Sequence, residues 1–132
     1  MPRHSLFMPS AIDYGYNGRF ITFSDLVETL YQSIGDHSEA RVINTFASYD
    51  CLVIDEMGYV EVEAAQVGLF FTLMHKRHKK KSTLITSNLG FAQWEEFLKN
   101  NHLTAALIDR LTENSHVINM KECVSLRSKL KA

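Results

Sequence analysis

Two carboxylates stand side by side where an apolar run ends. Residues 51–54, Cys-Leu-Val-Ile, lead directly into Asp55 and Glu56, and Gly58 follows in a turn. Consecutive side chains at a strand end point in different directions, so one carboxylate can hold a metal ion while its neighbour polarises a water molecule. The pair indicates metal-assisted hydrolysis, and the alternative is a buried strand that ends in two solvated acids.

A polar side chain also follows the next apolar run along the chain. Residues 83–86, Thr-Leu-Ile-Thr, are short and β-branched, and they end at Ser87 and Asn88. An asparagine at the tip of a neighbouring strand suits hydrogen bonding to an attacking water or to a terminal phosphate. The alternative is an asparagine in an ordinary turn between a strand and a helix.

Arg110 lies near the end of a helix predicted over residues 103–111. An arginine exposed there can reach a phosphate bound by a neighbouring subunit and stabilise its charge during transfer. The alternative is a surface pair with Asp109, which contributes little to stability.

A basic run spans residues 75–81. It concentrates five cations in seven residues: Lys76, Arg77, Lys79, Lys80 and Lys81. These predict salt-dependent contact with a nucleic-acid backbone. The alternative, which we slightly favour from the sequence, is a solvated helix end whose cations complement the helix dipole. His75 and His78 lie three residues apart, but the flanking cations would repel a metal, so no metal site is expected there.

Strands alternate with helices along the chain, which predicts an α/β fold with a mainly parallel sheet. Apolar or β-branched runs predict strands at residues 19–23, 51–55, 83–86 and 116–120. Helical spacing predicts helices at residues 24–35, 40–47, 63–80, 92–99 and 103–111. The unbroken apolar run before Asp55 is typical of a strand buried on both faces. Because chemistry sits beyond the carboxyl ends of parallel strands, Asp55, Glu56 and Asn88 should share one edge of the sheet.

The length and composition limit the kinds of protein that this chain can be. The chain has 132 residues, 45% hydrophobic and 22% charged, which suits one globular domain with a core. A net charge of -1 excludes a global basic field, so any nucleic-acid contact must be local. Cys51 and Cys123 lack zinc-ligand spacing and indicate a reducing compartment. No run is long enough to span a bilayer and the start lacks a signal-peptide core, so we expect a cytoplasmic protein without a membrane partner.

In this order and at these spacings, the motifs resemble those of IstB-like proteins, the AAA+ ATPase helpers of insertion-sequence transposases. The DnaC helicase loaders are close relatives of that family. The resemblance runs from about residue 11 to residue 126 and is strongest at residues 20–27, 51–59, 82–88 and 107–111, with Phe91 and Trp94 also similar. It implies a partial AAA+ P-loop NTPase core, in which residues 11–132 form the C-terminal portion of the ATPase domain and residues 1–10 are unassigned.

The resemblance also implies roles for single residues. Asp55 corresponds to the Walker B Mg²⁺ ligand, Glu56 to the catalytic base, Asn88 to the sensor 1 residue and Arg110 to an arginine finger. The implied cofactors are ATP and Mg²⁺. The implied partners are DNA, a transposase and further copies of the same chain. Family members are also basic in the region of residues 75–81.

The sequence departs from the family at the phosphate-binding loop. Its six glycines do not form the pattern G-x-x-x-x-G-K-[ST]. We therefore expect a truncated chain, with the loop and the strand before it upstream of Met1, and very weak nucleotide binding. That strand would lie between residues 83–86 and 116–120, so its loss would leave unpaired edges. Two alternatives stay open: a DnaC-like helicase-loader relative, and a non-catalytic fragment that binds DNA or protein.

Overall fold

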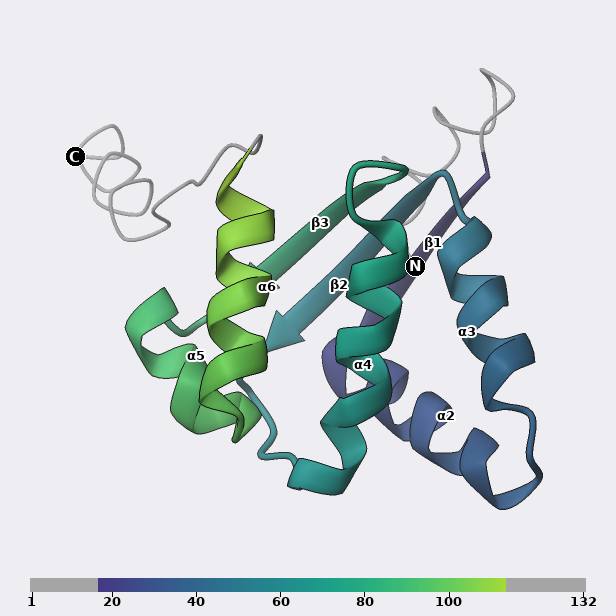
Figure 1. Ribbon diagram of the computed structural model, residues 1–132, viewed down its shortest axis with the longest axis horizontal. Helices are drawn as coiled ribbons and strands as arrows, with labels where there is room; N and C mark the ends of the chain where they lie inside the picture. Colours follow the sequence, from purple (N-terminus) through teal and green to yellow (C-terminus); the bar gives the residue numbers. More distant parts are fainter. Residues whose placement is uncertain (1–16, 114–132) are drawn as a thin grey trace, which may run out of the picture.

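The computed structural model describes residues 17–113, which form three parallel strands and five helices (Figure 1). The strands are β1 (Gly18–Thr22), β2 (Cys51–Met57) and β3 (Ser82–Ser87), in the spatial order β1-β2-β3. The helices are α2 (Phe23–Gly35), α3 (Glu39–Ser48), α4 (Ala64–Arg77), α5 (Phe91–Leu98) and α6 (Asn101–Glu113). The α/β class and the parallel sheet predicted from the sequence are confirmed.

Most boundaries differ from the prediction by one to three residues, and two of these differences have an identifiable reason. Thr22 caps α2, because its Oγ1 accepts a hydrogen bond from the Asp25 backbone N–H at 3.2 Å. Phe23 therefore starts the helix instead of ending the strand, and its ring packs edge-on against Phe70 in the core. Helix α4 ends at Arg77 instead of continuing to residue 80, and Lys79 adopts a left-handed φ of 62° in the turn that follows.

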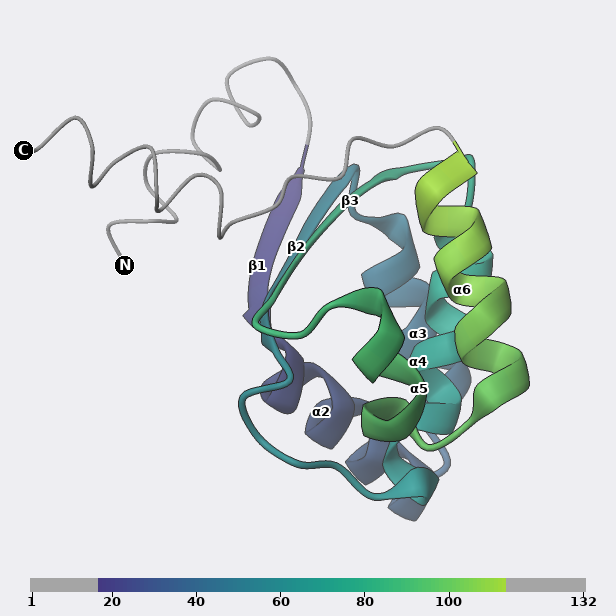
Figure 2. The ribbon, with the colours of Figure 1, turned by 90° about the vertical axis from the view of Figure 1, so that its left-hand side faces the viewer.

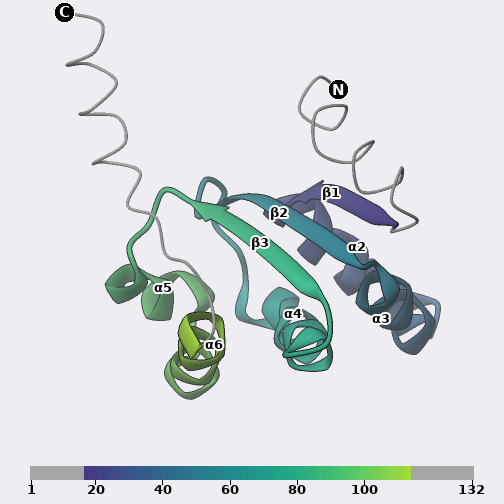
Figure 3. The ribbon, with the colours of Figure 1, turned by 90° about the horizontal axis from the view of Figure 1, so that it is seen from above.

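All five described helices lie on one face of the sheet (Figures 2 and 3). Ile21, Ile54 and Ile85 are neighbours across the three strands. Ile21 and Ile54 belong to the core beneath these helices, and the half-buried Ile85 packs against it. Because side chains alternate along a strand, the preceding row faces the other way. In that row Val53 is only 6% exposed, since it lies between two strands, whereas Leu84 on β3 is 52% exposed.

Strand β3 forms one edge of the sheet within residues 17–113. The predicted strand at residues 116–120 lies outside the described residues. None of the helices in the described part of the chain is long and apolar enough to cross a membrane.

Candidate functional site

The acidic pair lies on a β-bulge at the carboxyl end of the central strand. Ile54 pairs with Ile85 and Met57 pairs with Ser87, so both acids lie opposite the single residue Thr86. Glu56 has a left-handed φ of 62°, which is uncommon for a residue other than glycine. Bulges re-aim side chains, and here Asp55 is 6% exposed whereas Glu56 is exposed to solvent. The two carboxylates therefore occupy different environments.

Thr86 joins these two acids through one hydroxyl group. Its Oγ1 accepts a hydrogen bond from the Glu56 backbone N–H at 3.0 Å and donates one to Asp55 Oδ1. A threonine hydroxyl can do both at once, so one side chain orients the Asp55 carboxylate and braces the Glu56 backbone. Sequence reasoning assigns no role to Thr86, because its position opposite the acids depends on the register between β2 and β3.

Asn88 lies beside the turn that follows the acids. Its backbone N–H donates to the Met57 carbonyl oxygen at 3.3 Å, which joins the ends of β2 and β3. A Cβ atom placed on Gly58 would lie 2.5 Å from Asn88 Oδ1, and Gly58 has a φ of 99°. Glycine is thus required at this position for both space and backbone conformation. The structure brings Asp55, Glu56 and Asn88 to the carboxyl ends of β2 and β3, where the sequence predicts them.

The oxygen ligands at the carboxyl ends of β2 and β3 satisfy only part of what a Mg²⁺ ion needs. Mg²⁺ is usually held by one or two carboxylates, substrate phosphates and several waters. Asp55 provides an oriented carboxylate and Glu56 a second one nearby. Within residues 17–113, no group of three or more His, Cys, Asp or Glu side chains forms a cluster that could hold a metal. Phosphate oxygens and water would have to complete the coordination of an ion at Asp55.

Arg110 lies away from these acids. The end of α6 is joined to the turn before β3 by ion pairs from Glu113 to Lys79 at 3.1 Å and to His78 at 3.5 Å. That turn precedes β3, so the C-terminal end of α6 lies toward the amino ends of the strands (Figure 1). Arg110 is in the last turn of α6, whereas the acids are near the carboxyl end of β2. Within one chain the arginine and the acidic pair do not form a common site. Action on a neighbouring subunit stays a prediction.

Arg77 is a structural residue. Its side chain is 2% exposed and joins the end of α3 to the start of β3. The guanidinium donates hydrogen bonds to Thr83 Oγ1 at 2.8 Å and to the carbonyl oxygens of Phe46, Tyr49 and Ser82 at 2.7 to 2.9 Å. Burial lowers the pKa of Arg77, while these acceptors offset the lost hydration. The predicted nucleic-acid role of Arg77 does not fit this burial, because its donors point at oxygens inside the chain.

The four lysines of the basic run remain at the surface, at the opposite end of the sheet from the acids. Lys81 contacts Asp50 at 2.8 Å and Lys79 contacts Glu113 at 3.1 Å. Lys76 donates to Asn44 Oδ1 at 3.1 Å, and Lys80 is exposed. Surface contacts of this kind are weak and can be exchanged for others. A phosphate-backbone contact by Lys76, Lys79, Lys80 and Lys81 stays a prediction.

Comparison with known proteins decides the family. The family model described as IstB-like ATP binding protein matches residues 6–132, nearly the whole chain. The chain belongs to the IstB-like ATP-binding proteins. This confirms the resemblance seen in residues 51–59 and 82–88.

Curated relatives of this IstB-like chain come from insertion sequences. The chain is 33% identical over 123 residues to the insertion sequence IS21 putative ATP-binding protein of Pseudomonas aeruginosa, covering 92% of this chain and 46% of that protein. It is 32% identical over 120 residues to the IS5376 putative ATP-binding protein of Geobacillus stearothermophilus, covering 90% and 48%. The chain therefore spans about half the length of these relatives.

Solved structures share the fold of this IstB-like chain. The DnaC helicase loader superposes with a TM-score of 0.65 at 20% identity, over 80% of this chain and 62% of that one. DnaI superposes with a TM-score of 0.61 at 15% identity, over 76% and 55%. These likenesses support the predicted partial AAA+ P-loop NTPase core and, at such low identity, show the fold alone.

Proposed function

We propose that this IstB-like chain is part of an ATP-dependent helper of DNA transposition that acts in the cytoplasm with a transposase. The observation that carries the proposal is the acidic pair Asp55 and Glu56, braced by Thr86 and set beside Asn88. The insertion-sequence ATP-binding relatives support a nucleotide ligand and a role in transposition.

The environments of the two acids suggest different tasks. The buried Asp55 carboxylate, oriented by Thr86, would hold Mg²⁺, and a bound ion would neutralise charge on the phosphate oxygens. The exposed Glu56 carboxylate would accept the proton of the attacking water. Asn88, at the tip of the neighbouring strand, would orient that water or the terminal phosphate. Each role follows from the position of a carboxylate or amide at the carboxyl end of the sheet.

We further propose that the 132 residues by themselves bind ATP very weakly. They contain no G-x-x-x-x-G-K-[ST] loop, whose backbone N–H groups and lysine cradle the phosphates. Calorimetric titration with Mg-ATP should show no saturation, and a phosphate-release assay should show no turnover. Robust turnover that Glu56→Gln abolishes would overturn the weak-binding proposal while supporting the role of Glu56. Turnover that Glu56→Gln leaves unchanged would overturn that role.

We propose that DNA binds the basic run, residues 75–81, through Lys76, Lys79, Lys80 and Lys81. Binding of a fluorescent duplex should weaken with salt, and the slope of log K against log[salt] should shrink by about 0.9 for each lysine contact removed. Lys80→Ala is the cleanest single variant, because the described residues hold no partner for its amine. No binding at low salt would remove this part of the proposal.

The partner is tested by affinity capture. The tagged chain is incubated with the transposase of an IS21-type element and, separately, with a replicative helicase. We expect retention of the transposase, because the similar proteins come from insertion sequences. Retention of the helicase alone would favour the alternative helicase-loader role, whose support is the likeness in fold to DnaC and DnaI.

The second alternative is a non-catalytic fragment that binds DNA or protein. Two features of the sequence favour this alternative: the basic run at residues 75–81, and the absence of the pattern G-x-x-x-x-G-K-[ST] from the 132 residues. DNA binding or transposase capture that is indifferent to Mg-ATP and to Asp55→Asn would support this alternative. A response to nucleotide that Asp55→Asn removes would support the ATP-dependent role.

We also propose that copies of this IstB-like chain associate with one another to form a homo-oligomer.

A further inference from the structure

Strand β3 is an unprotected edge. It pairs with β2 on one side, and no strand of residues 17–113 occupies its other side, which we call the free side of β3. Edge strands are usually shielded by charged side chains, prolines, bulges or a covering element. The sequence of β3 has no charge and no proline, and the bulge lies on β2, whereas the opposite edge strand β1 carries the exposed Arg19. Strand β3 is therefore suited to pair with a further strand.

Burial falls from the central strand to β3 on both faces of the sheet. On the face under the helices, Ile54 is fully buried, whereas its neighbour Ile85 is half-buried. On the other face, Val53 is 6% exposed and its neighbour Leu84 is 52% exposed. Strands of a parallel sheet are normally buried on both faces. A strand on the free side of β3 would cover part of both Ile85 and Leu84.

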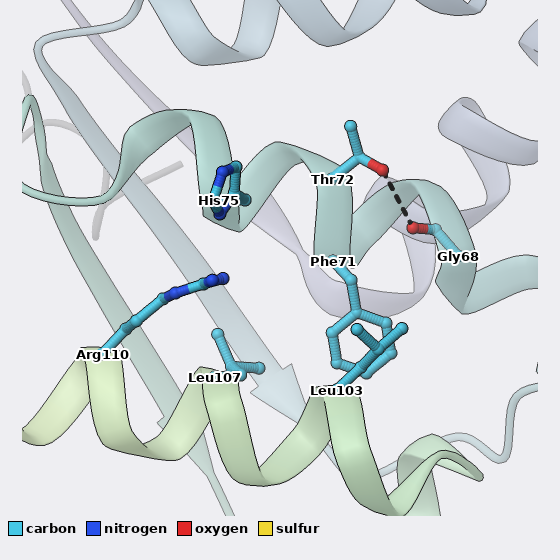
Figure 4. Close-up of a pocket in the computed structure, with 7 residues that line it drawn as sticks. All are labelled: Gly68, Phe71, Thr72, His75, Leu103, Leu107 and Arg110. Carbon is cyan, nitrogen blue, oxygen red and sulfur yellow. Dashed lines mark hydrogen bonds between the residues drawn. The ribbon is translucent and has the colours of Figure 1, made fainter.

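The helix layer provides apolar surface at the same end of the sheet. The helices follow in the order α3, α4, α6, in the direction in which β1, β2 and β3 follow one another (Figure 3). Leu103 and Leu107 of α6 point toward α4 and line a pocket with Phe71 (Figure 4). Ile108 and Leu111, on the adjoining stripe of α6, are only half-buried. Helix α6 can therefore cover a sheet that continues beyond β3.

The end of α6 lies next to the start of β3. Glu113 forms ion pairs with Lys79 at 3.1 Å and with His78 at 3.5 Å, in the turn that leads into β3. Only two residues separate Glu113 from residues 116–120, for which the sequence predicts a strand. A strand that begins there starts at the same end of the sheet as β3 and can run parallel to it.

The hand of the connections selects the free side of β3. The steps from β1 to β2 and from β2 to β3 pass through helices on one face of the sheet (Figure 2). Such connections between parallel strands are right-handed in about 98% of cases. Because α5 and α6 lie on that face too, a strand on the free side of β3 continues the same hand. A strand beside β1 would reverse the direction of travel over the same face and make the connection left-handed.

We propose that residues 116–120 pair with the free side of β3 of the same chain as a fourth parallel strand. Their apolar side chains, Val117, Ile118 and Met120, suit a strand that is covered on both faces. The family resemblance gives this place beside β3 to the strand before the phosphate-binding loop, and here the chain fills it with its own strand. A second polypeptide could then add a phosphate-binding strand beside β3 only by displacing residues 116–120. The pairing is independent of the proposed role in transposition and of the proposed self-association.

Nuclear magnetic resonance on the isotope-labelled 132-residue chain tests this pairing directly. We expect nuclear Overhauser effects (NOEs) between β3 and residues 116–120 in the pattern of parallel strands, with slow hydrogen exchange at amides of both segments. In a mixture of labelled and unlabelled chains, an isotope-filtered experiment should lose these NOEs, because the contact lies within one chain.

Two proline variants test the ladder hydrogen bonds and serve as controls for each other. Backbone N–H groups of adjacent residues in a strand point to opposite sides, so only one of Val117→Pro and Ile118→Pro removes a donor to β3. That variant should speed hydrogen exchange at β3 amides on the order of tenfold. The other should exchange like the wild type, because an edge strand tolerates proline where its nitrogen faces solvent.

Several results would overturn the pairing. NOEs between the β3 strands of two copies, or NOEs to residues 116–120 that survive the isotope filter, would show that another chain occupies the edge. NOEs that place residues 116–120 beside β1 would contradict the hand of the connection. Fast exchange without cross-strand NOEs on the free side of β3, or equal exchange in the two proline variants, would show that residues 116–120 do not pair there. If a proline variant does not fold, the NOEs of the wild type still decide.

Discussion

The Thr86 hydroxyl accepts a hydrogen bond from the Glu56 backbone N–H at 3.0 Å, across the bulge between β2 and β3. This contact joins residues 30 positions apart in the sequence. It braces Glu56 in a left-handed conformation that a residue with a Cβ adopts at a cost of about 1–3 kcal/mol. The same hydroxyl donates to Asp55, so the arrangement of both acids depends on one side chain.

Thr86→Val should destabilise the chain by about 1–2 kcal/mol, because the buried Asp55 carboxylate and the Glu56 N–H each lose a hydrogen bond. Thr86→Ser keeps the hydroxyl and should lose less than about 0.5 kcal/mol. Urea unfolding measures both values, and amide hydrogen exchange at Glu56 reports the local effect. Equal stability and equal exchange in the two variants would show that the hydroxyl does not brace the bulge.

Gly58→Ala should destabilise the chain by about 1–3 kcal/mol. The new Cβ would meet Asn88 Oδ1 at 2.5 Å and the Leu89 side chain at 2.7 Å, and the φ of 99° disfavours any side chain. Gly68→Ala is the control with the opposite sign: it should stabilise α4 by about 0.5–1 kcal/mol, because Gly68 lies inside a helix with open space around it. Thermal unfolding compares the two, and a neutral Gly58→Ala would contradict the close approach of Asn88.

Arg77→Met should destabilise the chain by about 2–4 kcal/mol, since it leaves the carbonyl oxygens of Phe46, Tyr49 and Ser82 without their buried donor. Lys80→Ala, at an exposed neighbouring position, should stay within about 0.5 kcal/mol of the wild type. Urea unfolding separates the two variants. If Arg77→Met weakens DNA binding at full stability, then Arg77 reaches the surface and its structural role is wrong.

At acidic pH, the free energy of unfolding should depend on two surface carboxylates, the half-buried Asp50 and the exposed Glu113. A hydrogen bond from Lys81 lowers the pKa of Asp50 from its ordinary value of 3.8, and one from Lys79 lowers the pKa of Glu113 from 4.5. A carboxyl pKa that is lower in the folded state stabilises the fold above the unfolded value, and this contribution is lost as pH falls through the folded value. The free energy of unfolding should therefore decline as the pH falls below about 4.5.

Asp50→Asn and Lys81→Met should each reduce this decline, because either change removes the Asp50–Lys81 pair. The measurement is the urea midpoint at a series of pH values, at low and high salt, since salt screens exposed pairs. If the free energy of unfolding falls with pH at the same slope in both variants as in the wild type, then the Asp50–Lys81 pair does not contribute to the pH dependence of stability. The double variant should behave like either single variant.

Much of the fold follows from local patterns. The apolar run before Asp55 predicts β2, and the spacing of Val67, Phe70, Phe71 and Met74 predicts the buried face of α4. Boundaries were less predictable, because they depend on single capping contacts. The Thr22 hydroxyl caps α2 by accepting a hydrogen bond from the Asp25 backbone N–H, and the spacing of apolar residues does not reveal this contact.

The sequence by itself determined the strand that carries Asp55 and Glu56 and the strand that ends before Asn88, because hydrophobic periodicity is a local property of the chain. It also determined the family, through motifs kept in order. Only the tertiary structure decided that Thr86 braces the acids, that Arg77 is buried, and that Arg110 and Asp55 lie toward opposite ends of the strands within one chain. The physical reason is that register, burial and the packing of helices depend on contacts between residues distant in sequence, which no local pattern records.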